Sequence, residues 1–275
     1  MTYCVAMRLD AGLVFLSDSR TNAGLDQIST FRKMSVYEQP GDRVMVLLSS
    51  GNLAITQAVR QLLHTETISG EGGTVSIWNC RTMFDAVRIV GAAVRKVYER
   101  DAASLKNFGI EFNVNLIFGG QIQGETMRLF NVYAAGNFVE AGVDGVCYVQ
   151  IGESKYGKPI LDRVVTPATP LDQAAKCALV SMDSTLKSNL SVGLPLDLLV
   201  YEADTLHAQR IVHIDDHDPY FRMIRETWGH RLRDVFESIP NPSWDVGSDE
   251  TTLKPAAAQQ LESLNPLRKI NAPEG

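Results

Sequence analysis

The sequence predicts an α+β fold in which layers of helices cover antiparallel sheets. Hairpin-like pairs of strands open the chain, and two helical patterns follow only after about four strands. A second group of strands comes next, and a second pair of helices follows that group. Strands and helices that alternated one by one would indicate a parallel sheet, so this grouping argues against that class.

The start of the chain reads as a hairpin followed by a polar segment. Tyr3 to Leu9 form the first expected strand, Asp10-Ala11-Gly12 a tight turn, and Leu13 to Leu16 the returning strand. The returning strand leads into Ser17-Asp18-Ser19-Arg20-Thr21. Residues 21–28 are polar, and we expect them to form a connecting loop.

Two further strands and a helix follow this loop. Residues 29–38 and 43–50 read as strands on either side of Gln39-Pro40-Gly41-Asp42, because proline followed by glycine marks a turn. The run from Arg43 to Leu48 is nearly all apolar, which is typical of a strand that is buried on both faces. It ends at Ser49-Ser50-Gly51-Asn52, where an apolar helical pattern begins.

The rest of the chain contains strands and helices of ordinary length. Residues 65–78 read as a polar, glycine-rich connection, and Gly119-Gly120 as part of a turn. The expected helices are residues 81–105, 155–165, 171–189 and 219–238, and the expected strands are 112–118, 126–134, 148–152, 194–202 and 208–214.

Composition limits the classes of partner and compartment. A net charge of −6 over 275 residues does not favour nucleic acid or an anionic membrane as a partner. The four cysteines are scattered without metal-ligand spacing, which favours free thiols in a reducing compartment. No apolar run is long enough to span a membrane, and no signal peptide opens the sequence. We therefore expect a cytoplasmic protein.

Thr2, Asp18 and Lys33 are the candidate catalytic residues. A threonine hydroxyl needs a base beside it, and a free α-amino group with a pKa of about 7.7–8.0 is suited to that task. Removal of Met1 would give Thr2 such an amine. Lys33 would then lower the cost of forming an alkoxide, and Asp18 would keep Lys33 charged and oriented. Taken singly, each of these residues is more often an ordinary terminal, turn or surface residue.

Several ordered segments together resemble proteasome β-type subunits, and most closely the bacterial ancestral β-subunit family, Anbu. The similarity covers about residues 2–240 and is carried by T-Y-C-V-A-M-R-L-D-A-G-L-V-F-L-S-D-S-R-T, F-R-K-M-S-V-Y, G-D-R-V-M-V-L-L-S-S-G-N-L-A and S-N-L-S-V-G-L-P-L-D-L-L-V-Y-E. The resemblance implies an N-terminal-nucleophile hydrolase with a four-layer αββα sandwich of two antiparallel sheets. It also implies that Thr2 is the nucleophile, that Asp18 and Lys33 support it, and that no cofactor is needed.

The same resemblance suggests residues that line the substrate cleft. It places the oxyanion donor at Ser50 or Gly51, where a backbone N–H at the start of a helix could stabilise a tetrahedral intermediate. An ordinary helix cap is the alternative interpretation of the serines. Thr21 and Asn22 would contact the substrate backbone, or would simply belong to a connecting loop.

Two loops depart from the proteasome pattern. Glu153 stands where these subunits usually carry a serine, and Ser154 follows one residue later. Either Ser154 substitutes for that serine, or Glu153 adds a negative charge that raises the pKa of the Thr2 amine. Ser191 aligns with a supporting loop serine, whereas Ser188 occupies the place of the loop aspartate. The nearest upstream acid, Asp183, is expected to face along its helix.

Three functions remain open. The first is a threonine-type endopeptidase that acts on peptides or unfolded chains inside a homo-oligomeric ring or an open helical ring. The second is a hydrolase of a non-protein amide, since one fold serves many substrates. The third is a non-catalytic assembly subunit. Whether an ATP-driven unfoldase assists is not predictable from these residues.

We expect a hydrolase domain at residues 1–216, a helical extension at 217–240 and a loosely ordered tail at 241–275 with a short helix at 256–264. The aromatic side chains of the extension suit packing on a neighbouring subunit or on the chain's own sandwich. The His- and Asp-rich segment 213–218 is read as a helix cap and turn, and no metal site is expected.

Overall fold

The computed structural model describes residues 2–22, 28–70, 73–142 and 145–242. Its contacts divide the chain into two units, Met1–Leu232 and Arg233–Gly275. The first unit contains both sheets and the helices that pack on them. The expected tail at 241–275 and its short helix at 256–264 lie almost entirely outside the described residues.

Two antiparallel five-stranded sheets form the centre of the first unit. The first has the strand order β12-β1-β2-β13-β14, and its strands are β1 (Tyr3–Leu9), β2 (Gly12–Asp18), β12 (Tyr148–Gly152), β13 (Leu196–Glu202) and β14 (Arg210–Ile214). The second has the order β11-β10-β9-β6-β5, and its strands are β5 (Met34–Gln39), β6 (Arg43–Gly51), β9 (Val114–Ile122), β10 (Arg128–Val132) and β11 (Phe138–Glu140).

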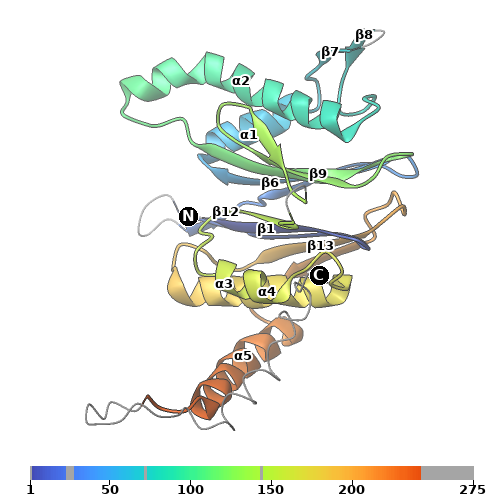
Figure 1. Ribbon diagram of the computed structural model, residues 1–275. Coiled ribbons are helices and arrows are strands. Elements are labelled where there is room, and N and C mark those ends of the chain that lie inside the picture. The colour runs from blue at the N-terminus through green and yellow to red at the C-terminus, as the bar shows by residue number, and fades with distance from the viewer. Residues whose placement is uncertain (1, 23–27, 71–72, 143–144, 243–275) are drawn as a thin grey trace, which may run out of the picture. The chain divides into compact units, whose positions relative to one another are not determined.

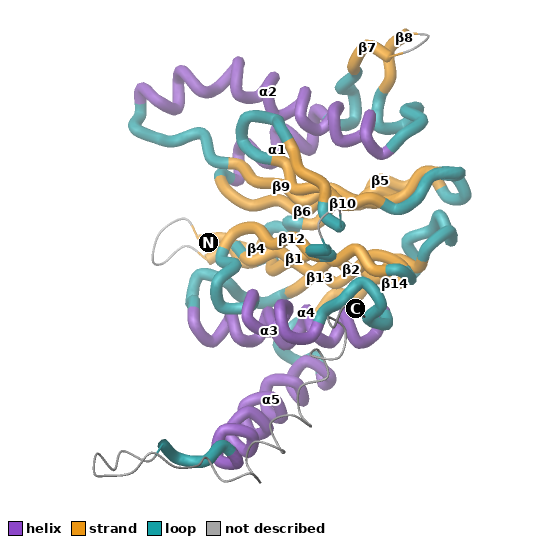
Figure 2. Tube along the Cα trace, in the orientation of Figure 1, coloured by secondary structure: helices purple, strands orange, loops and turns teal. Residues whose placement is uncertain are grey.

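Helices cover the outer face of each sheet (Figures 1 and 2). The helices are α1 (Leu53–Leu62) and α2 (Met83–Asn107) over the second sheet, and α3 (Lys158–Val164) and α4 (Leu171–Ser188) over the first. One apolar core lies beneath α1 and α2, one beneath α3 and α4, and a third joins the two sheets. The four-layer αββα sandwich is therefore confirmed.

The sequence pattern explains the strands nearest the site. The β1–β2 hairpin closes at Asp10-Ala11 as expected, and every residue of β2 is buried. β6 is buried on both faces over Arg43–Ser50, because it pairs with β5 and β9 in the middle of the second sheet. The strand continues through Ser49 and Ser50, so these serines do not cap α1. The side chain of Asn52 is the cap, accepting a hydrogen bond from Ala54 N at 3.0 Å.

Several turn and loop predictions were wrong. Gly119 and Gly120 lie inside β9, where the close approach of β6 leaves no room: a Cβ on Gly120 would be 2.0 Å from Val44 O. The segments expected to be loops contain the strands of two small two-stranded ribbons. The short strand β11 was not predicted. The ribbons are β3 (Arg20–Asn22) with β4 (Ile28–Thr30), and β7 (Ile68–Gly70) with β8 (Gly73–Val75).

Helix α5 (Pro219–Ser238) confirms the expected amphipathic helix after the last strand. Asp218 caps it, because its Oδ1 accepts a hydrogen bond from Phe221 N at 2.7 Å. Phe221 and Ile224 join the core beneath α4. Among the described residues, no group of three or more His, Cys, Asp or Glu side chains is placed to hold a metal ion. The described helices include none that is long and apolar enough to cross a membrane.

Candidate active site

Thr2 directly precedes β1 and is held in place by the neighbouring strand, β12, and the residue that follows it. Its carbonyl accepts a hydrogen bond from Glu153 N at 2.7 Å, and the next residue, Tyr3, pairs with Gly152 of β12. Gly152 has a φ of +80°, and a Cβ on it would lie 2.0 Å from Thr2 O. Only glycine therefore fits here, and Thr2, itself 9% exposed, is fixed by backbone contacts.

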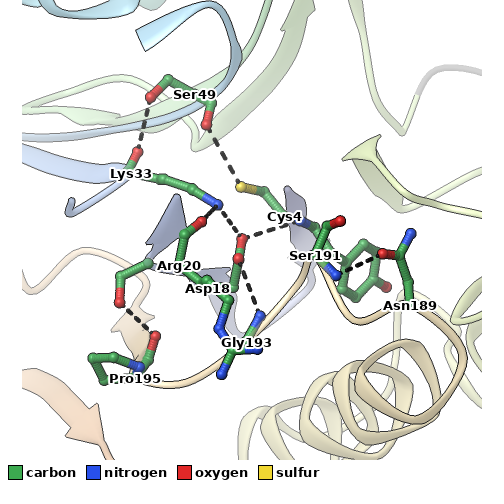
Figure 3. A network of polar contacts seen from close by, with 11 residues as sticks. Cys4, Asp18, Arg20, Lys33, Ser49, Asn189, Ser191, Gly193 and Pro195 are labelled. Atoms are coloured by element: carbon green, nitrogen blue, oxygen red, sulfur yellow. Dashed lines mark hydrogen bonds and ion pairs between the residues drawn. The ribbon is translucent and has the colours of Figure 1, made fainter. Parts of the chain in front are cut away.

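Asp18 and Lys33 form an almost fully buried ion pair (Figure 3). Lys33 Nζ donates to Asp18 Oδ1 at 2.7 Å and to Arg20 O at 2.8 Å. Asp18 Oδ1 also accepts from Tyr3 N at 3.1 Å, and its Oδ2 accepts from Gly193 N at 3.4 Å. The pair therefore ties the start of β1 to the end of β2 and to the chain before β5.

Burial sets the protonation preferences around this pair. Desolvation raises the pKa of the Asp18 carboxyl, and the Lys33 ammonium with the two backbone N–H donors opposes that rise. Burial also raises the pKa of the Cys4 thiol, whose Sγ lies 3.9 Å from Ser49 O. Cys4 is therefore a neutral packing residue, and Lys33 is the cationic group beside Thr2.

The end of β6 presents the candidate oxyanion donor. Ser49 N donates to Lys33 O at 3.0 Å, whereas Asn52 N donates to Asn113 O at 2.9 Å on the β9 side. Strand N–H groups alternate between the two edges, so the Gly51 N–H points to the Lys33 side and the Ser50 N–H to β9. Of the two expected donors, Gly51 is the better placed.

The two loops that differ from the proteasome pattern, at Glu153 and at Ser191, are connected by a residue that the sequence analysis did not single out. Asn189 Nδ2 donates to Glu153 Oε2 at 2.8 Å. The Oδ1 of Asn189 accepts from Ser191 N at 2.9 Å (Figure 3). Glu153 is only 7% exposed, and Lys155 Nζ lies 3.5 Å from its Oε1. Asn189 follows α4 directly, and no local pattern marks it as a bridge.

The other residues that the sequence singled out near these loops are Ser154, Ser188 and Asp183, and their contacts are different. Ser154 N donates to Gly152 O at 3.0 Å, so it shapes the turn after β12. Ser188 ends α4 and is exposed. Asp183 is fully buried, with ion-pair distances of 3.5 Å to Lys187 and 3.3 Å to Arg225 of α5, so it faces that helix.

A cavity of about 450 Å³ lies where the start of β1, the segment before β5 and the end of β6 meet. Thr2, Thr21, Lys33, Ser50 and Gly51 line it, which brings together most of the expected catalytic and substrate-binding residues. Asn22 ends β3, and its side chain lies outside the described residues. The lining residues that the sequence did not indicate are Arg20, Arg32, Ser49, Leu53, Thr56, Arg60, Asn113, Asn115 and Gly152.

The fold and the layout of this cavity define an N-terminal-nucleophile-hydrolase-like protein. No protein-family model matches the sequence, and no curated protein does. Solved structures do match. Anbu from Yersinia bercovieri is 51% identical, with a TM-score of 0.80, over 88% of this chain and 100% of its own.

Two further structures support the same relationship. Anbu from Hyphomicrobium sp. strain MC1 is 48% identical, with a TM-score of 0.79, over 88% of this chain and 100% of its own. A structure described as the helical assembly of the Anbu complex from Pseudomonas aeruginosa is 46% identical, with a TM-score of 0.81, over 90% of this chain and 100% of its own. This chain belongs to the Anbu (ancestral β-subunit) family, a proteasome β-like group.

Proposed function

We propose that this protein is a threonine-type peptidase in which Thr2 is the nucleophile. The observation that carries the proposal is a buried Lys33–Asp18 pair of 2.7 Å at the cavity where Thr2 lies. A buried ion pair whose lysine lines a cavity together with the first residue after Met1 is a candidate functional site. Lys33 supplies positive charge where an alkoxide would form, and Asp18 holds that charge in place.

The proposed reaction proceeds through an acyl-enzyme. After Met1 is removed, the Thr2 amine accepts the hydroxyl proton, and Oγ attacks the carbonyl carbon of the scissile amide. The Gly51 N–H donates to the developing oxyanion. The C–N bond then breaks, and the proton passes to the leaving amine. Water attacks the resulting ester, which restores the Thr2 hydroxyl and releases the acid.

Glu153 is proposed to act on the amine indirectly. Its N–H holds Thr2 O, while Asn189 and Lys155 engage its carboxylate. The Lys155 ammonium offsets part of the negative charge that the carboxylate would present to the Thr2 amine. Asn189 and Ser191 therefore position the loop that faces the nucleophile and take no proton themselves.

The proposed working form is a homo-oligomer in the cytoplasm. The Pseudomonas aeruginosa relative forms a helical assembly, and at 46% identity the same mode of association is proposed here. We also propose residues 1–216 as the hydrolase domain and 217–240 as a helical extension. Mass photometry and electron microscopy would show an open, helically offset ring, and a monomer at micromolar concentration would contradict the assembly.

Thr2→Ala is the test of the mechanism, with Thr2→Ser as its matched control. Intact mass spectrometry first establishes that Met1 is absent from both variants and from the wild type. Peptide turnover, or labelling by an electrophilic peptide epoxyketone, is then compared. We expect loss in Thr2→Ala and retention in Thr2→Ser, because serine keeps the nucleophilic oxygen. Equal turnover in Thr2→Ala and the wild type would refute the role of Thr2.

A further inference from the structure

The cavity has a charge opposite to that of the protein as a whole. The chain carries a net charge of −6, yet every ionisable side chain among the described lining residues is cationic: Arg20, Arg32, Lys33 and Arg60. The other lining side chains are neutral. A local field of this sign attracts anionic groups, even on an acidic protein.

Two of these four cations already have carboxylate partners. Lys33 is paired with Asp18, as described above. Arg32 Nε lies 3.8 Å from Asp197 Oδ1, which also faces His213 Nδ1 at 3.0 Å. Within the part of the chain that the structure describes, neither Arg20 nor Arg60 forms an ion pair.

Arg20 contacts the segment after α4, and none of the described carboxylates compensates its charge. Its Nη1 donates to Leu190 O at 3.2 Å, and its Nε is buried without a hydrogen-bond partner. The guanidinium lies against Gly193, where an added Cβ would be 2.0 Å from Nε. The rest of the guanidinium has no carboxylate partner among the described residues, so its positive charge is available to an anionic ligand in the cavity.

Arg60 approaches the same cavity from α1. Its Nη1 donates to Arg32 O at 2.9 Å, which fixes the side chain against the segment before β5. Its other guanidinium N–H groups form no hydrogen bond with the described residues. Guanidinium groups bind carboxylates through two parallel hydrogen bonds, and an arginine that is already ordered loses less entropy in doing so.

We propose that this cavity selects acidic peptides, in which Arg20 and Arg60 bind a glutamate or aspartate side chain near the amide that Thr2 attacks. The cleavage part of this statement rests on the function proposed above, whereas the binding part does not. Arg20 and Arg60 are thus specificity-determining residues, separate from the Thr2, Asp18 and Lys33 set.

Binding to the Thr2→Ala protein tests the preference without any reaction. Three fluorescein-labelled peptides, identical except for a central Glu, Gln or Lys, are compared by fluorescence anisotropy. Glu and Gln have nearly the same size, so their difference isolates charge. We expect the Glu peptide to bind at least about tenfold more tightly than the Gln peptide, with the Lys peptide weakest. Raising the salt concentration should reduce the ratio.

Arg60→Gln should lower the Glu-to-Gln ratio several-fold, and Arg20→Gln should do the same. The matched control is Arg88→Gln on α2, which removes one positive charge from a side chain that is 47% exposed and does not line the cavity. Arg88→Gln should leave the ratio unchanged. If Arg20→Gln fails to fold, Arg60 alone decides the outcome, because its side chain is only partly buried and makes one backbone hydrogen bond.

The proposal is overturned if the Glu peptide shows no measurable binding, if Glu and Gln bind alike, or if Arg60→Gln and Arg88→Gln change the ratio equally. Failure of the proposed function would look different. In that case the Glu preference would persist, while the Met1-free wild type would neither cleave the Glu peptide nor react with a Glu epoxyketone.

Discussion

Lys33→Met should destabilise the folded chain by removing the cation that compensates a fully buried carboxylate. Asp18 is 0% exposed, and without Lys33 it would keep only the N–H groups of Tyr3 and Gly193, at 3.1 and 3.4 Å. Methionine matches the aliphatic stem of lysine, so packing changes little. Breaking a buried pair in this way costs about 3–5 kcal/mol.

The loss should depend on pH in a defined direction. Burial already raises the pKa of the Asp18 carboxyl, and removing the ammonium raises that pKa further. A carboxyl whose folded pKa lies above its unfolded value of about 3.9 is protonated more readily in the folded state. Its contribution to stability is therefore present at low pH and lost as pH rises through the folded pKa. The deficit of Lys33→Met should be largest at neutral pH and shrink on acidification.

Chemical denaturation at fixed protein concentration and several pH values between 5 and 8 measures this deficit. The double variant Lys33→Met with Asp18→Asn is the control, because it removes both charges and should recover most of the lost stability at neutral pH. A deficit that does not change with pH would refute the reasoning. So would a double variant that is no more stable than Lys33→Met.

Two further predictions concern the loop beside Thr2. Gly152→Ala should abolish peptide turnover, since its Cβ would lie 2.0 Å from Thr2 O, whereas Gly41→Ala, at a similar φ of +81° with open space around it, should cost only about 1–2 kcal/mol and keep turnover. Equal turnover in both would contradict this. Asn189→Ala should lower the free energy of unfolding by about 1–3 kcal/mol, because Glu153 loses a buried donor. An unchanged denaturation midpoint would exclude the bridge as a stabilising contact.

Much of the fold was predictable because its signals are local. Apolar runs on either side of a tight turn located the β1–β2 hairpin, and the apolar run of β6 indicated a strand buried on both faces. The errors fall where local signals mislead. Gly119-Gly120 looks like a turn, yet glycine is required there by the close approach of β6. The ribbons and β11 are three residues long, too short for any periodicity to show.

The family was also predictable from the sequence, because the matching segments follow one another in order over about residues 2–240. The catalytic roles of Thr2, Asp18 and Lys33 stay predictions. The structure showed which of the Ser50 and Gly51 N–H groups points to the Lys33 side of β6, since only strand pairing sets the direction of an N–H group. It likewise placed Asp183 against α5, where an ion pair with Arg225 connects residues 42 positions apart.

The sequence alone predicted a layered α+β chain with a candidate nucleophile, Thr2, and with Asp18 and Lys33 close behind it. Tertiary structure alone decided what surrounds them. Asn189 bonds to Glu153, 36 positions earlier in the chain, and also to Ser191, and arginines from β3 and α1 line one cavity. The physical reason is that such contacts depend on how distant segments cross in space. Periodicity and spacing describe only neighbours along the chain.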